Sequence, residues 1–304
     1  MEPVEREPAQ DVVEPASRRD RTRLWAAALR ANQQQLAQRA QTERGRHRSV
    51  DAAFEMVERD GDVGGGIIAG ALAYRLFIWL LPLALVAVAG LGFAADAASS
   101  SPEEAADSLG IEGLVSSSIT NAAESPNRWY ALLIGIPALL WTTRSLLRVL
   151  IGAHRLVWSD VRAAAPKPTP LATLRLLALL LSFGAVTTLD SALRSWSPWP
   201  GLIATLATVA AYAGLWLLIS LKLPHRSADW VELLPGALLC GLGIEVLNVV
   251  VVYVITPWAL AKQGTYGTLG AAAALLFGLY LISRVVVGAA VVNAALWERR
   301  ARPE

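Results

Sequence analysis

The sequence contains few of the side chains on which soluble enzymes depend. It has one cysteine and three histidines in 304 residues, and charged residues make up only 17 % of it. Soluble domains carry about a quarter charged residues, so this chain has too few to cover a water-exposed surface. The single cysteine, Cys240, excludes an intrachain disulfide. A net charge of +2 with no continuous basic patch does not indicate a nucleic-acid partner.

Long apolar runs take the place of the missing charge, and apolar residues make up 54 % of the chain. A helix that crosses a bilayer needs about 20 largely apolar residues. Six stretches meet that length: 66–94, 129–150, 171–190, 202–221, 233–256 and 268–291. None of them alternates apolar and polar residues as the strands of a barrel do. We therefore predict an all-α, polytopic membrane helix bundle with six transmembrane helices, surrounded by the lipid bilayer.

The distribution of basic residues predicts the orientation of the bundle. Nineteen of the 27 Lys and Arg residues lie before the first span, after the last span or in the alternate loops between spans. The other three loops carry one each: Arg128, Arg194 and Lys262. Acidic residues crowd the first of these loops, between Asp96 and Glu124. Because basic loops stay in the cytoplasm, we predict that both termini are cytoplasmic.

The N-terminal part differs from the rest. Residues 1–48 form a polar and partly disordered arm, rich in Glu, Pro, Gln and Arg, ahead of a membrane domain at 49–300. The mixed charges of the arm predict no cleavable signal. Segment 49–59 has apolar residues at helical spacing, which predicts a short helix. That helix either lies on the cytoplasmic membrane surface or is solvated.

Signatures of catalysis are missing. His47, His154 and His225 belong to no pattern of zinc ligands, and no Gly-x-Ser-x-Gly sequence occurs. The glycines of GTYGTLG (264–270) precede no Lys-Ser or Lys-Thr pair, so this segment predicts a flexible outer loop and no phosphate site. We expect no catalytic residue, no metal site and no cofactor, and therefore a protein that is not an enzyme.

Of the charged residues within or at the ends of the predicted spans, four stand out. They are Arg75, Arg144, Glu245 and Arg284, and counting residues from the span ends places all four in the cytoplasmic half of the membrane. A charge within hydrocarbon is costly, so each of them is a functional candidate. On the fifth predicted span, Asn248 continues a small or polar face that includes the glutamate.

Two interpretations of these charges stay open. In the first they converge, and the excess positive charge binds an anion, because a guanidinium matches the geometry of phosphate and carboxylate. The candidate substrate-binding residues are then Arg75, Arg144, Glu245, Asn248 and Arg284. In the second, Glu245 pairs with Arg75 or Arg284 and only holds the helices together.

Small residues of the fifth span suggest how it packs. Gly236, Ala237, Cys240, Gly241 and Gly243 recur at a spacing that suits close contact between helices. We interpret them as packing residues.

Four segments carry a resemblance to a known family: 68–93, 135–158, 230–250 and 265–296. They resemble the YihY/BrkB family of bacterial inner-membrane proteins, over about residues 50–297. The most specific matches are Ala73-Tyr74, Leu81-Pro82, Trp141, His154, Trp158, Trp230, Leu234-Pro235-Gly236, Tyr266-Gly267, Leu269-Gly270, Gly288-Ala289 and Asn293.

The resemblance implies a six-helix protein of the bacterial cytoplasmic membrane and suggests a transporter. Members of the family also carry the label ribonuclease BN, but this sequence has neither a zinc-ligand set nor a basic face for RNA. We expect a transporter or flippase that moves an anionic solute or lipid head group through a positively charged pocket open to the cytoplasm. The alternative is a structural or envelope-assembly membrane protein that transports nothing. A homo-oligomer is compatible with both.

Overall fold

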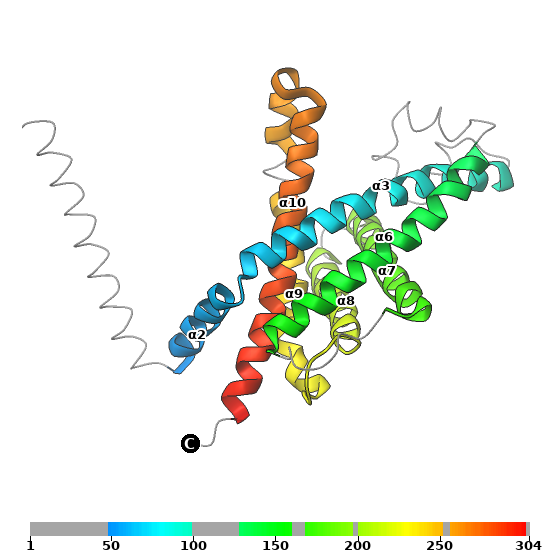
Figure 1. Ribbon diagram of the computed structural model, residues 1–304. Helices are drawn as coiled ribbons and strands as arrows, with labels where there is room; N and C mark the ends of the chain where they lie inside the picture. The colour runs from blue at the N-terminus through cyan, green and yellow to red at the C-terminus, as the bar shows by residue number, and fades with distance from the viewer. Residues whose placement is uncertain (1–47, 99–127, 160–167, 197–199, 252–255, 302–304) are drawn as a thin grey trace, which may run out of the picture. The chain divides into compact units, whose positions relative to one another are not determined.

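The structure is a computed structural model that describes residues 48–98, 128–159, 168–196, 200–251 and 256–301. Within these ranges the chain forms seven helices and no strand (Figure 1). The helices are α2 (Arg48–Asp62), α3 (Gly65–Ala98), α6 (Arg128–Val157), α7 (Pro170–Trp196), α8 (Pro200–Ser220), α9 (Trp230–Val250) and α10 (Thr256–Ala301). The chain divides into two units between Phe54 and Glu55. Of the first unit only the beginning of α2 is described, so the following sections concern the second.

Six helices, all except α2, are long and apolar enough to cross a membrane. This confirms the predicted all-α bundle with six candidate spans. Segment 49–59 is helical as predicted, within α2. Residues 1–47 of the predicted arm and most of the acidic loop lie outside the described residues.

Several span boundaries differ from the prediction. The fifth span is Trp230–Val250 instead of 233–256, and the sixth is Ala272–Ala301 instead of 268–291. The second span continues to Val157, because His154 in its last turns is buried against other helices and does not end the apolar packing. The predicted loop at 264–270 is wrong, since α10 is helical from Thr256 onward. A glycine in a helix interior costs only about 1 kcal/mol, and the Ala- and Leu-rich sequence that follows favours helix.

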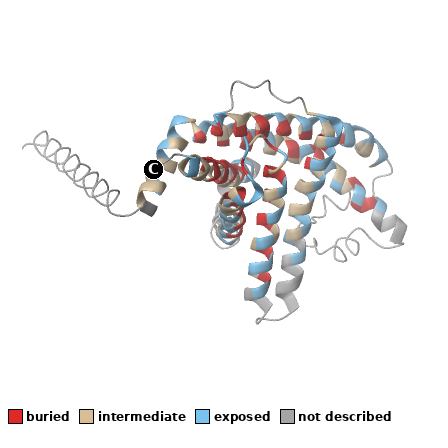
Figure 2. Cartoon of the chain, turned by 90° about the horizontal axis from the view of Figure 1, so that it is seen from below, coloured by how far each residue is buried: buried red, intermediate tan, exposed pale blue. Residues whose placement is uncertain are grey.

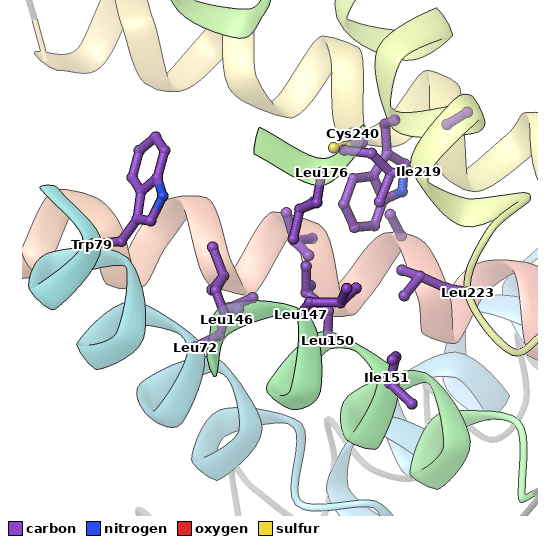
Figure 3. Packing of buried hydrophobic residues seen from close by; sticks show 14 of the residues in the cluster. Leu72, Trp79, Leu146, Leu147, Leu150, Ile151, Leu176, Ile219, Leu223 and Cys240 are labelled. Atoms are coloured by element: carbon purple, nitrogen blue, oxygen red, sulfur yellow. The ribbon is translucent and has the colours of Figure 1, made fainter. Parts of the chain in front are cut away.

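Buried residues recur along the helices, as the red segments of the ribbon in Figure 2 show. The larger core cluster joins residues of α3, α6, α7, α8, α9 and α10 (Figure 3). Leu146 and Cys240 within it are fully buried. Cys240 therefore serves as a small packing residue in this core.

Helices α3 and α6 pack along each other. Trp79 Nε1 donates a hydrogen bond to Thr143 Oγ1 at 2.9 Å, and the Thr143 hydroxyl donates to the Leu139 carbonyl at 2.6 Å. Trp79 is thus held in the interface between the two helices. Further along the pair, a Cβ at Gly135 would crowd the side chain of Val86, so the glycine allows the close approach.

The small residues of α9 are packing residues, as predicted. A Cβ at Gly241 would crowd the Val209 carbonyl oxygen and Ala213 of α8. On another side of α9, a Cβ at Gly236 would overlap the Ala289 carbonyl oxygen of α10. Glycines at these positions let α9 lie close to both neighbouring helices.

Asn293 of α10 supports the first turns of α9. Pro235 has no backbone N–H and interrupts the hydrogen bonds of that segment. The next amide, of Gly236, donates to Asn293 Oδ1 at 2.7 Å, and Asn293 Nδ2 donates to the Leu233 carbonyl at 3.1 Å. The Asn293 side chain is 2 % exposed, so both of its bonds form in the interior. A single buried amide therefore joins α9 to α10 beside the proline.

Candidate functional site

The predicted site residues Arg75 and Arg144 are both exposed on the surface of the described chain. Arg75 lies ten residues into α3, about 15 Å from its first residue. Arg144 lies thirteen residues before Val157, about 20 Å from the end of α6 and close to the middle of that span. Because the span is longer than predicted, Arg144 lies near its middle instead of near its end.

A second arginine, Arg148, extends the surface around Arg144. The two residues are four apart on α6, so their side chains lie on the same face, and both are exposed. Trp141, one turn before Arg144, is 70 % exposed. Neither arginine has an ion-pair partner among the residues that the structure describes. We call the surface formed by Trp141, Arg144 and Arg148 the α6 arginine face.

Arg284 has a carboxylate partner that the sequence did not predict. Its guanidinium donates two hydrogen bonds to Asp60 of α2, at 3.1 and 2.9 Å. The side chains are 34 % and 23 % exposed, so solvent reaches the pair. Asp60, and not Glu245, is therefore the acid that binds Arg284, so the pair between Glu245 and Arg284 in the second interpretation is wrong. The positive charge of Arg284 is balanced, and it adds little to an anion site.

Glu245 and Asn248 face a different helix. Gly241 packs on α8, and residues four and seven further along α9 lie on that same side of the helix. Glu245 is 5 % exposed, whereas Asn248 is half-buried. By helical rise Glu245 lies about 22 Å from Trp230 but only about 8 Å from Val250. The predicted site is thus distributed: Arg144 on α6, Arg75 on α3, Arg284 with α2, and Glu245 with Asn248 toward α8.

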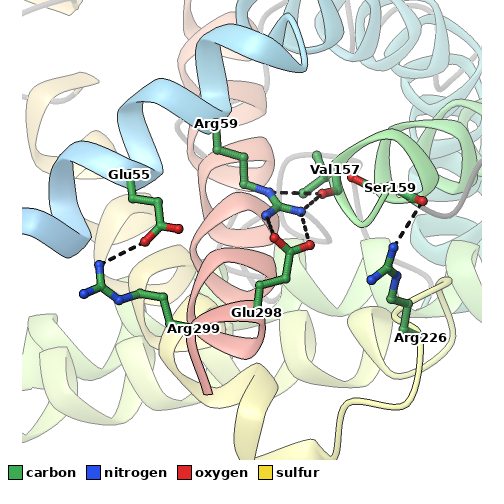
Figure 4. A network of polar contacts seen from close by, with 7 residues as sticks. All are labelled: Glu55, Arg59, Val157, Ser159, Arg226, Glu298 and Arg299. Atoms are coloured by element: carbon green, nitrogen blue, oxygen red, sulfur yellow. Dashed lines mark hydrogen bonds and ion pairs between the residues drawn. The ribbon is translucent and has the colours of Figure 1, made fainter. Parts of the chain in front are cut away.

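A polar junction joins the ends of several helices (Figure 4). At its centre the Arg59 guanidinium binds both carboxylate oxygens of Glu298, at 2.5 and 3.0 Å. It also donates to the Val157 carbonyl, from Nη2 at 2.6 Å and Nε at 3.3 Å. That carbonyl belongs to the last turn of α6, where no further helical amide is available to it. One side chain of α2 therefore binds the ends of both α6 and α10.

Two further contacts extend the junction. Arg299 Nη1 binds Glu55 Oε2 at 2.9 Å, a second pair between α10 and α2. Arg226, in the α8–α9 connection, donates to the Ser159 carbonyl at 3.3 Å and lies 5.6 Å from the centre of the Trp297 ring. Figure 4 shows these residues converging from four parts of the chain.

Sequence reasoning missed the junction, because it treated 49–59 as a helix on a membrane surface or in solvent. The available signal was a run of charges, Glu55, Arg59 and Asp60, placed directly before the first span. Opposite charges at the C-terminus of the chain, such as Glu298 and Arg299, were the matching signal. Neither signal states which residues pair.

The described residues contain no group of three or more His, Cys, Asp and Glu side chains that could hold a metal ion. His154 is buried in α6, where Nδ1 lies 3.2 Å from the Leu150 carbonyl, and its ring lies 6.0 Å from that of Trp216. The first contact lies within α6, and the second packs α6 against α8.

The ends of two spans carry aromatic residues of the kind that mark a membrane interface. Trp129 and Tyr130 stack at the start of the α6 span, with ring centroids 3.7 Å apart and about half of each side chain exposed. At the start of α9, Trp230 is 58 % exposed. Tryptophan and tyrosine favour the head-group region of a bilayer.

Six long apolar helices and these aromatic residues define a multi-pass integral membrane protein. The family model described as "Virulence factor BrkB" matches residues 59–304. The chain therefore belongs to the BrkB family, which confirms the resemblance carried by the sequence. The match begins at Arg59, the central residue of the junction. Comparisons with curated proteins and with solved structures give no match.

Proposed function

We propose that the protein moves an anionic solute or lipid across the cytoplasmic membrane, and that the anionic group binds at the α6 arginine face. The observation that carries the proposal is the exposure of Arg144 and Arg148 inside a span, without an acidic partner among the described residues. An arginine at the centre of a lipid-facing helix costs about 2.5–3.5 kcal/mol on insertion scales. Water or a bound anion at this face would remove that cost.

The spacing of the two arginines suits a phosphate-bearing head group. Residues four apart on a helix are separated by about 6 Å of rise, so the two guanidinium groups form successive binding positions along the span. Each offers a fork of N–H donors that matches two phosphate oxygens. A head group that passes from Arg148 to Arg144 approaches the middle of the span without losing its positive partner. The step is transport alone, and the proposal includes no chemical reaction.

The proposed orientation places the junction and both termini in the cytoplasm. Arg59, Arg226 and Arg299 lie at the junction, and basic residues near span ends favour the cytoplasmic side. In this orientation Arg148 is the arginine of the α6 face that lies nearer the cytoplasm, and Arg144 is the deeper one.

The test is a lipid-transfer assay with the purified full chain in liposomes. Fluorescent phosphatidylglycerol in the inner leaflet is followed by quenching from outside, beside fluorescent phosphatidylcholine. We expect the wild-type chain to transfer the anionic lipid faster, and the Arg144→Gln/Arg148→Gln chain to lose that preference. A charge-assisted hydrogen bond contributes about 1.5–3 kcal/mol, so each substitution lowers the rate about tenfold or more.

Arg175→Gln is the matched control for this assay. Arg175 is also an exposed arginine of a span, but it lies only five residues into α7, about 8 Å from its first residue. We expect the control to transfer lipid at the wild-type rate. Equal rates for the double variant and the control would contradict the proposed role of the α6 arginine face.

One observation favours the alternative function, a structural or envelope-assembly protein. The pair between Arg284 and Asp60 and the contacts of Arg59 bind helices together and leave those charges engaged. A chain that transfers no lipid or anion in the assay, while it folds and keeps these pairs, would support this second function.

A further inference from the structure

Glu245 is a buried carboxyl group that the anion site does not use. It lies one helical turn after Gly241, whose neighbours are Val209 and Ala213 of α8. Residues on α9 turn by about 100° each, so Glu245 and Gly241 share the side that faces α8. Gly243, two residues before Glu245, instead faces Val285 of α10. The carboxyl group therefore belongs to the α8–α9 interface.

The α8 side of this interface carries hydroxyl groups. Thr205 lies one turn before Val209 on the same side of α8. Thr208, which directly precedes Val209, is 4 % exposed. One turn further on, Tyr212 is 2 % exposed, and its hydroxyl lies 2.8 Å from Thr187 Oγ1 of α7. Three helices thus bring neutral oxygen atoms into a membrane-embedded layer with the Glu245 carboxyl group. Helix α7 also carries Asp190, three residues after Thr187, with a side chain outside the described part.

Helices α8, α9 and α10 bring little charge to this layer. Helices α8 and α9 contain no Lys, Arg or His, and their titratable side chains are Tyr212, Glu232, Cys240 and Glu245 itself. On α10 the titratable side chains of the described part near this depth are Tyr280 and Arg284, and Arg284 binds Asp60. The side chains of Lys262 and Tyr266 lie outside the described part.

Resting on the transport function proposed above, we propose that Glu245 is a proton-binding site whose loading and release accompany the movement of the anion. A buried glutamate beside a layer of hydroxyl groups is unsuited to binding an anion, because an ionised carboxylate and the anion would repel each other. It can hold a proton as a neutral acid, with the neighbouring oxygens as hydrogen-bond partners. The described residues contain no group of three or more His, Cys, Asp and Glu side chains that could hold a metal ion here.

Labelling with an apolar fluorescent carbodiimide tests this proposal on the full chain in liposomes, without substrate. The reagent accepts the acid proton on one nitrogen while the carboxylate oxygen adds to its central carbon. An acyl shift from oxygen to nitrogen then gives a stable acylurea, and no atom is lost. We expect label on Glu245, mapped by peptide mass spectrometry, and labelling that falls as the pH is raised across the range tested.

Three variants make the result interpretable. Glu245→Asp keeps the carboxyl group and should keep the pH-dependent label, whereas Glu245→Gln should lose it. Glu232→Gln removes the other carboxyl group of α9 and should leave the label on Glu245 unchanged. Absence of label on a folded wild-type chain at every pH would overturn the proposal. Protection by sodium ions at constant pH would also overturn it, in favour of a sodium site.

This labelling is independent of lipid transfer, so the two proposals can fail separately. A labelled chain that transfers no lipid would retain the proton site and remove the transport function. A chain that transfers anionic lipid at one rate across the same pH range, with no label on Glu245, would do the reverse.

Discussion

Replacing Gly236 with alanine is expected to destabilise the protein by about 3 kcal/mol. The added Cβ would overlap the Ala289 carbonyl oxygen and the amide of Asn293. The backbone of α10 cannot change rotamer as a side chain can, so α9 and α10 must move apart. Separation also weakens the bond from the Gly236 amide to Asn293. Thermal unfolding of the purified chain in detergent should show a melting temperature lower by about 6–10 °C.

Gly288→Ala is the control for this substitution. Gly288 also lies on α10, and a Cβ added there meets nothing within 4 Å. Alanine favours helix over glycine by about 1 kcal/mol, so we expect an unchanged or slightly higher melting temperature. A Gly236→Ala chain as stable as Gly288→Ala would contradict the close packing of α9 on α10.

Replacing Arg59 with leucine is expected to cost about 2–3 kcal/mol of stability. The substitution leaves the Glu298 carboxylate and the Val157 carbonyl without their donor. Breaking a fully buried pair costs about 3–5 kcal/mol. The Arg59 and Glu298 side chains are 14 % and 28 % exposed, so solvent lowers that value. Thermal unfolding measures the loss, and proteolysis should show α2 released from the junction.

Arg300→Leu is the matched control, because it also removes an arginine that pairs with an acid near the junction. Arg300 lies 3.9 Å from Glu232, and its side chain is 60 % exposed. An exposed pair contributes about 0–1 kcal/mol. Similar losses for Arg59→Leu and Arg300→Leu would show that Arg59 does not bind the helix ends together as described.

The spans could be predicted from the sequence because their signal is local. A run such as 66–94 is apolar over more than the thickness of a bilayer, whatever its neighbours are. Boundaries were harder where polar residues are buried. His154 looks like the end of a span, yet helix packing encloses it, and only the neighbouring helices decide that.

The partners of the intramembrane charges could not be predicted in the same way. Arg284 binds Asp60, which is 224 positions earlier in the chain and lies outside the spans that the prediction considered. The direction of Glu245 depends on the rotation of α9 about its axis, which the contacts of Gly241 with α8 determine. Pairing and rotation are properties of the packed bundle, so apolar runs and residue spacing do not determine them.

We expect the α6 arginine face to lie in contact with water and anions rather than with lipid chains. Ser145→Cys in a Cys240→Ala chain tests this contact, because the half-buried Ser145 directly follows Arg144 at the edge of the face and cysteine has nearly its shape. We expect a negatively charged thiol reagent to label the cysteine at position 145 rapidly in liposomes, and added phosphatidylglycerol to slow this labelling. Leu133→Cys, on an apolar and exposed part of α6, should label slowly. Equally slow labelling at both positions would contradict the contact of the α6 arginine face with water.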